Sequence, residues 1–138
     1  MADSPIQKLL DALDTLDVEQ VMALTSPSAS FRLMDGGSAE GSDGVRVLLA
    51  ENMSQLRAAR HRITAQWRQD DVWIAEVDAT YELRDGAQTA TLGRAFIAHF
   101  EPDGLTELHV YGDHEHPLHT DAGAQRGLVI GGHWIPPL

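Results

Sequence analysis

Cysteine is absent from this chain of 138 residues, so neither disulfides nor thiolate chemistry contribute to its fold or function. No apolar run approaches the roughly 20 residues that a membrane-spanning helix needs, and the first residues lack the basic and apolar regions of a secretion signal. Basic residues are also scarce, since 10 Lys and Arg stand against 21 Asp and Glu, for a net charge of −11. Such a surface repels phosphate backbones and anionic lipids. We therefore expect a cytoplasmic protein with no nucleic-acid partner and no membrane partner.

Helical periodicity fills the first part of the chain. Ser4-Pro5 is typical of a helix start, because serine caps free N–H groups and proline is tolerated in the first turn. Asp17, with Gln20 three residues on, resembles a capping box and predicts a second helix. A third helix is expected from Asp43, with Asn52 as its one polar residue among apolar positions and Arg60 near its end. A short strand is expected before it, over residues 30–34.

From His61 onward the period of the apolar positions changes from 3.6 to 2. The alternation predicts four strands, over residues 61–68, 72–84, 87–101 and 105–112. Helices followed by an antiparallel meander indicate the α+β class rather than a parallel α/β sheet. A chain of 138 residues has room for one such domain.

The turns between these strands predict their register. A two-residue loop at Asp85-Gly86 pairs Val77 with Arg94 and places the apolar residues of both strands on one face. A type I turn over residues 101–104 pairs Phe96 with His109 in the next hairpin. A single bulge in this second hairpin would move every side chain of the last strand to the opposite face.

Four segments, in this order, resemble the nuclear-transport-factor-two/SnoaL-like family. They are a link between two helices (13–20), a first strand (29–37), an entry of small residues into the third helix (41–46), and a closing strand (109–113) followed by Pro117-Leu118. The resemblance implies that residues 1–118 form a cone-shaped α+β barrel, with three N-terminal helices packed on a curved antiparallel sheet around a pocket. It also implies a homodimer, which members of this family often form. Members include ketosteroid isomerases, polyketide cyclases, scytalone dehydratase and limonene epoxide hydrolase, alongside pocket proteins without known chemistry.

The predicted inward face of the sheet supplies the candidate site. Apolar residues with a few convergent polar groups are what a small-ligand pocket needs. We predict that His109 and Asp113 form a proton-transfer pair and that Tyr111 or Tyr81 donates a hydrogen bond to a developing oxyanion. Alternatively, Asp113 forms an ion pair with Arg94 that closes the strand end, and His109 is an ordinary half-buried histidine. The predicted pocket residues are Phe31, Trp73, Val77, Tyr81, Leu92, Arg94, Phe96 and Trp134.

Two family chemistries do not fit the sequence. The epoxide hydrolases of the family carry an Arg and an Asp two residues apart on one strand, whereas Phe96 stands two residues after Arg94 here. The ketosteroid isomerases place a general-base Asp near the region that residues 32–37 occupy. Asp35 is the only acid there, and its Asp-Gly-Gly context predicts a turn residue instead.

A histidine-rich segment follows the last predicted strand. His114, His116 and His119 lie among acidic residues, a composition that suits zinc or iron. Their spacing matches no rigid site such as two histidines at i and i+4 of a helix, so we interpret the segment as a solvated loop. We expect no metal and no other cofactor.

The last 20 residues, 119–138, begin as a polar linker and end in an apolar stretch. A soluble chain seldom leaves such an end in water. We predict that this tail, with Trp134, packs on the domain or on a dimer partner and forms a lid over the pocket or a contact between subunits.

The sequence thus leaves three functions open. The first is a cofactor-independent isomerase, lyase or cyclase that transfers a proton on a hydrophobic, ring-bearing small molecule. The second is a non-catalytic binding protein for such a molecule, and the third is a dimerisation module. Ile74, Ala95 and Ile97 alternate toward the outer face of the predicted sheet, which favours a homodimer through that face.

Overall fold

A computed structural model describes the backbone of residues 4–89, 91–112, 128–130 and 133–135, and the side chains of residues 4–34, 36–89 and 91–112. The chain begins with helix α1 (Pro5–Asp14) and helix α2 (Val18–Met22). The predicted caps are confirmed, because the Ser4 hydroxyl accepts a hydrogen bond from the Gln7 backbone and the Asp17 carboxylate accepts one from the Glu19 backbone. The two caps fix where each helix starts.

The main sheet has six strands in the order β2-β1-β6-β5-β4-β3. The strands are β1 (Thr25–Leu33), β2 (Ser38–Glu40), β3 (Leu56–Gln69), β4 (Val72–Leu83), β5 (Leu92–Glu101) and β6 (Gly104–Gly112). All neighbours run antiparallel except β1 and β6, which are parallel. A 3₁₀ turn, η1 (Met34–Gly36), and helix α3 (Gly41–Met53) complete the domain. The predicted class, three helices on a curved and mostly antiparallel sheet, is confirmed.

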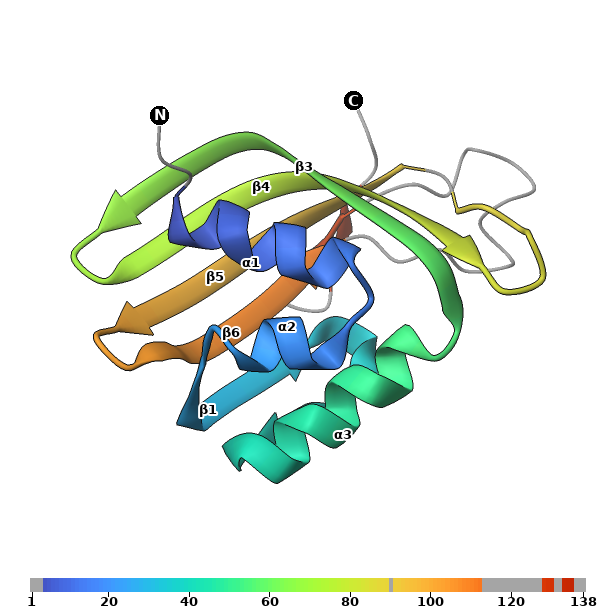
Figure 1. The fold of residues 1–138 in the computed structure, drawn as a ribbon. Coiled ribbons are helices and arrows are strands. Elements are labelled where there is room, and N and C mark those ends of the chain that lie inside the picture. Colours follow the sequence, from blue (N-terminus) through green and yellow to red (C-terminus); the bar gives the residue numbers. More distant parts are fainter. Residues whose placement is uncertain (1–3, 90, 113–127, 131–132, 136–138) are drawn as a thin grey trace.

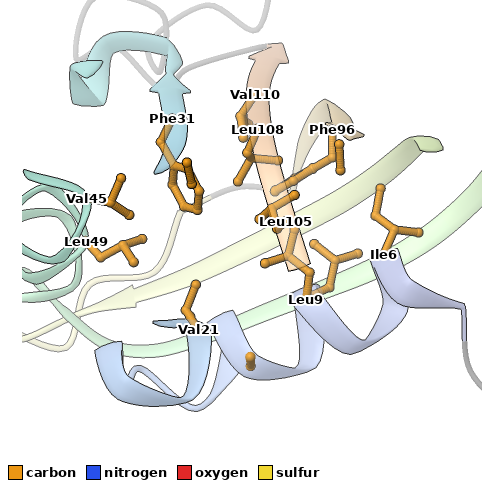
Figure 2. Close-up of a cluster of buried hydrophobic side chains, with 14 of the residues drawn as sticks. Ile6, Leu9, Val21, Phe31, Val45, Leu49, Phe96, Leu105, Leu108 and Val110 are labelled. Atoms are coloured by element: carbon orange, nitrogen blue, oxygen red, sulfur yellow. The ribbon is translucent and has the colours of Figure 1, made fainter. Parts of the chain in front are cut away.

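The curved sheet wraps around the helices (Figure 1). Helix α1 lies across the inner face of the long strands, and α3 closes the side next to β1. The core fills the space between them: Ile6 and Leu9 of α1 point toward Leu105 of β6, and Phe31 of β1 faces Leu49 of α3 (Figure 2). All five side chains are almost completely buried. Their burial stabilises the arrangement of helices on sheet, at about 25 cal/mol per Å² of apolar surface.

The boundary between α3 and β3 differs from the prediction. Helix α3 starts at Gly41 and ends at Met53 instead of running from Asp43 to about Arg60, and Asp43 lies in its first turn. Residues 56–60 instead begin β3 and pair with β4, from Leu56 with Leu83 to Arg60 with Thr80. Alanine and arginine favour a helix locally, but here a neighbouring strand satisfies their backbone hydrogen bonds.

The first strand is longer than predicted, and a second pairing was not foreseen. Strand β1 starts at Thr25 rather than Ser30, and Phe31 pairs with Ala39 of β2 on one side and with Leu108 of β6 on the other. The parallel pairing of β1 and β6 joins residues more than 70 positions apart, so no local turn in the sequence predicts it. In the tail, β7 (Leu128–Ile130) and β8 (His133–Ile135) form a two-stranded antiparallel sheet.

Candidate functional site

A cavity of about 290 Å³ opens between the helices and the inner face of the sheet. Its walls come from α1, β1, η1, α3, β3, β4, β5 and β6, so most elements of the domain shape it. The volume lies near the lower end of the range of about 300–1,000 Å³ typical of small-molecule sites. Most of the wall is apolar, including Leu13, Leu33, Met34, Leu49, Phe96 and Val110. Such a cavity favours a compact apolar ligand.

Three residues form a hydrogen-bonded chain on the wall of this cavity. The ring Nδ1 of His61 lies 2.6 Å from Asp14 Oδ1, and its Nε2 lies 2.9 Å from the Tyr81 hydroxyl. The His61 backbone N–H also donates to Asp14 Oδ2 at 3.3 Å. Asp14 is the last residue of α1, so the end of this helix holds the imidazole ring on β3 against Tyr81 on β4.

The chemistry of the three groups determines which atom donates in each of the two side-chain hydrogen bonds. A carboxylate only accepts hydrogen bonds, so Nδ1 of His61 carries the proton that points to Asp14. In the neutral imidazole, Nε2 is then an acceptor, and the Tyr81 hydroxyl donates to it. The His61 side chain is 5% exposed, and it packs edge-on against Phe96 with ring centroids 5.6 Å apart. The site therefore contains a buried His61 ring, and the Tyr81 hydroxyl is hydrogen-bonded to its acceptor nitrogen, Nε2.

Arg94 lies beside the phenol. Its guanidinium carbon is 5.3 Å from the centroid of the Tyr81 ring. Burial raises the pKa of Tyr81 above its ordinary value, while the positive charge of Arg94 lowers it and the negative charge of Asp14 raises it. Burial is the largest of these effects, so Tyr81 is a neutral hydrogen-bond donor at neutral pH.

Asn52 explains how a polar residue fits among the apolar positions of α3. Its side-chain amide donates to the backbone carbonyl of Leu48, at 2.8 Å, and to that of Gly36 in η1, at 3.1 Å. The bond to Gly36 ties the helix to the 3₁₀ turn, and both Asn52 and Gly36 line the cavity. Asn52 thus positions the wall, with one hydrogen bond inside its own helix and one across to η1.

Three of the predicted pocket residues, Tyr81, Arg94 and Phe96, line the cavity. Phe31 and Val77 lie in the hydrophobic core instead, and the half-buried Trp73 packs against that core. Leu92 is buried but does not border the cavity. These three residues were placed correctly because the register of β4 and β5 was predicted correctly: Val77 pairs with Arg94 and Ala75 with Phe96.

The predicted inward placement of His109 and Tyr111 is wrong. The turn at residues 101–104 pairs Phe100 with Leu105 as expected, but a bulge between His99 and Phe100 shifts the register by one residue. Phe96 therefore pairs with Val110 and not with His109. Val110 and Leu108 face the cavity, while His109 and Tyr111 face outward and contact each other through Nδ1 and the hydroxyl at 3.2 Å.

Asp14 and His61 were missed as site residues, although the sequence contained a signal for each. Asp14 stands four residues after Leu10, so it continues the buried stripe of α1. His61 stands between Ala59 and Ile63, two positions that alternate toward the inside of β3. A carboxylate and an imidazole on two buried faces are a stronger signal than the histidines of the tail.

Several predictions fall outside the described residues. They concern Asp113 with its ion pair to Arg94, the side chain of Trp134, and the cluster of His114, His116 and His119. Over residues 4–112, leaving out residue 90, no three His, Asp or Glu side chains are grouped as a metal site. Within the described helices, none is long and apolar enough to cross a membrane.

Comparisons with known proteins agree with this architecture. The family model of the SnoaL-like domain matches residues 6–109. A similar solved structure is a protein from Catenulispora acidiphila with a ketosteroid isomerase-like fold in complex with trimethylamine, with a TM-score of 0.71, 12% identity, and 80% of this chain and 86% of that chain covered. No curated protein matches the chain.

Two further structures have the same fold. One is a putative SnoaL-like polyketide cyclase from Shewanella denitrificans, with a TM-score of 0.69, 12% identity, and 79% of this chain and 88% of that chain covered. The other is TerC, co-crystallised with polyporic acid, with a TM-score of 0.67, 17% identity, and coverage of 79% and 88%. At such identities these structures show a shared fold and no more. The family model, which covers residues 6–109 and so most of the chain, shows that this chain belongs to the SnoaL-like domain family.

Proposed function

We propose that the cavity binds a compact, ring-bearing small molecule and that Tyr81, His61 and Asp14 transfer a proton to and from it without a cofactor. The observation that carries this proposal is the unbroken chain from the Asp14 carboxylate through the His61 ring to the Tyr81 hydroxyl at the wall of an apolar cavity. A purely structural histidine needs one or two partners, but it does not need a phenol that connects it to a cavity.

The chain can accept a proton in one concerted step. A C–H bond next to a ligand carbonyl breaks, its proton passes to the Tyr81 oxygen, and the Tyr81 proton passes to His61 Nε2. The electron pair stays on the ligand as an enolate, and the Asp14 carboxylate stabilises the imidazolium that forms. The reverse transfer to another ligand atom completes an isomerisation, and transfer with loss of a leaving group completes an elimination.

One solved structure of the same fold is named for a reaction that the proposed one resembles, and the likeness itself shows the fold alone. A putative polyketide cyclase and a putative hydroxylase from Streptomyces galilaeus share the fold with this chain. Polyketide cyclisation proceeds through enolates, which proton transfer next to a carbonyl produces. The catalytic roles proposed for His61 and Tyr81 rest only on the geometry of these residues in this protein.

The test is deuterium exchange into a model ketone. We expect the protein to accelerate exchange of the protons next to the carbonyl of 2-tetralone in D₂O, measured by proton NMR. His61→Asn should slow the protein-catalysed exchange by about 10²-fold or more, which is the usual contribution of general acid–base catalysis. Tyr81→Phe should slow it similarly, because the phenol connects the ligand to His61.

His109→Asn is the matched control. This histidine lies on the outer face of the same sheet, where it contacts Tyr111 and does not line the cavity. Its exchange rate should equal that of the unmodified protein. If the protein gave no acceleration, or if His61→Asn remained as fast as His109→Asn, the proposed proton transfer would be wrong. Melting temperatures of all variants show whether each one is folded.

A further inference from the structure

The charge of the cavity wall is opposite to that of the molecule. The protein as a whole carries −11, yet Arg94 is the one residue with a permanent charge on the wall, and no Asp or Glu lines the cavity among the residues that the structure describes. Asp14 reaches the site only through His61. A ligand in this cavity therefore meets a positive charge in an apolar surrounding.

Arg94 also has few acceptors for its hydrogen-bond donors. Its Nη1 donates to the sulfur of Met34, which is a weak acceptor, and its Nε is buried without a hydrogen-bond partner among the residues that the structure describes. Over residues 4–89 and 91–112, no carboxylate forms an ion pair with it. Burying a donor of a charged group without an acceptor is costly, so the arrangement favours a partner that supplies one.

We propose that the ligand is a ring-bearing carboxylic acid, bound as its anion with the carboxylate on Arg94 and the ring against the apolar wall. This inference rests on the proposed function and names the class of its substrate. A guanidinium is the side chain that best matches a planar carboxylate, because two parallel N–H groups donate to the two oxygens.

The position of Arg94 also suits the proton transfer. Removing a proton next to a ketone carbonyl of a ligand that also carries a carboxylate leaves two negative charges on one small molecule. A guanidinium that pairs with the carboxylate offsets one of them, in a cavity where electrostatic interactions are strong. Because the guanidinium lies beside the Tyr81 ring, a carboxylate on Arg94 holds the ligand next to the residue whose phenol receives the proton.

The experiment compares two probes of the same ring and similar size, one charged and one neutral. 2-Naphthoate is an anion at neutral pH, and 2-acetonaphthone carries an uncharged ketone in place of the carboxylate. We expect the protein to bind 2-naphthoate at least tenfold more tightly than 2-acetonaphthone in isothermal titration calorimetry. Arg94→Gln should abolish this preference while leaving the affinity for the ketone within about threefold.

Arg94→Lys is the second variant, since it keeps the charge without the fork of donors. It should retain part of the preference, which a loss of folding would not do. Equal affinities of the unmodified protein for the two probes would overturn the inference, and this is also the result expected if Asp113 neutralises Arg94. A preference that survives in Arg94→Gln would overturn it as well.

The proposed function fails in a different way. If neither probe bound, the ligand cavity itself would be refuted, and the carboxylate with it. If the ketone bound and exchanged its protons but the naphthoate bound no better, only the inference about the carboxylate would be wrong.

Discussion

Tyr81 stands between two charges of opposite sign, Asp14 behind His61 and Arg94 beside its own ring. Burial dominates and raises the pKa of the phenol above the value of about 10 of a free tyrosine. Because the folded pKa lies above the unfolded one, the stabilisation from Tyr81 is present below about pH 10 and is lost as the pH rises through the folded pKa.

We therefore expect Tyr81 to ionise above pH 10 in the folded protein. The chain has 2 tyrosines, so the difference between the absorbance titrations of the unmodified protein and Tyr81→Phe isolates the titration of this phenol near 295 nm. A midpoint at or below 10, recorded while circular dichroism still reports a folded protein, would contradict the burial of the hydroxyl.

The sequence correctly predicted which residues of the β4–β5 hairpin line the cavity, but it did not predict the residues of other elements that contact them. Tyr81, Arg94 and Phe96 follow from strict alternation and from the predicted pairing of Val77 with Arg94. The predicted two-residue loop is wrong, because the Leu83 N–H donates to the Ala87 carbonyl and Glu82 pairs with Gln88, one residue off the predicted register, before β5 begins at Leu92. Asp14 and His61 meet because a helix end docks on a strand 47 residues later, and that docking is not encoded by any turn. Local rules therefore predict which side chains face inward, but not which of them meet.

At the scale of elements, the bulge between β5 and β6 decides what the site contains. One extra residue in β6, Thr106, lies opposite the step from His99 to Phe100, and it moves His109 and Tyr111 to the outer face and brings Leu108 and Val110 to the cavity. The Thr106 hydroxyl donates to the His99 carbonyl at 3.1 Å, next to the irregularity. The turn alone does not report this insertion, but the apolar residues of β6 do, because Leu105, Leu108 and Val110 do not keep a period of two.

The end of β6 gives a prediction about stability. Gly112 pairs with Arg94 and has a φ of 143°, and a Cβ there would lie 2.8 Å from the Arg94 Cα. Gly86 also has a positive φ, of 92°, but its Cβ would come no closer than 3.9 Å to any atom outside its neighbours. The two glycines share the conformational strain and differ in the collision with backbone.

We expect Gly86→Ala to lower the free energy of unfolding by about 1 kcal/mol and Gly112→Ala by more than about 2 kcal/mol. Urea denaturation measures both. Equal losses would mean that the close approach of Gly112 to β5 is not rigid. Because the collision pushes on Arg94, Gly112→Ala should also weaken binding of 2-naphthoate.

At the scale of the whole molecule, the outer face of the sheet carries apolar side chains in register. Trp67 pairs with Ile74, and Ile74 pairs with Ile97. Trp67 is 52% exposed, Ile74 37% and, further along, Tyr111 43%. Contiguous apolar patches of this kind mark interfaces more often than free surface. We propose that two copies of the chain pack through this face.

Sedimentation equilibrium at micromolar concentration tests the dimer. We expect twice the chain mass of 15.1 kDa for the unmodified protein and the mass of a monomer for Ile74→Glu, because a charge in the interface lacks a partner. Val47→Glu is the matched control, since Val47 is 57% exposed on α3, away from the sheet face. A monomeric unmodified protein would refute the proposal.

In the described part of the chain, Arg94 is the one permanently charged residue on the cavity wall, within a molecule of charge −11, and this has a consequence for kinetics. An organic anion approaches against the long-range repulsion of the surface and meets attraction only at the end of its path. Dissolved salt screens the first effect beyond a Debye length of about 10 Å at 0.1 M and leaves the contact in the dry cavity almost untouched. Association should therefore accelerate as ionic strength rises, while dissociation stays nearly constant. At low salt, the surface charge therefore slows the association of anionic ligands and raises their Kd, while the lifetime of the bound complex stays nearly the same.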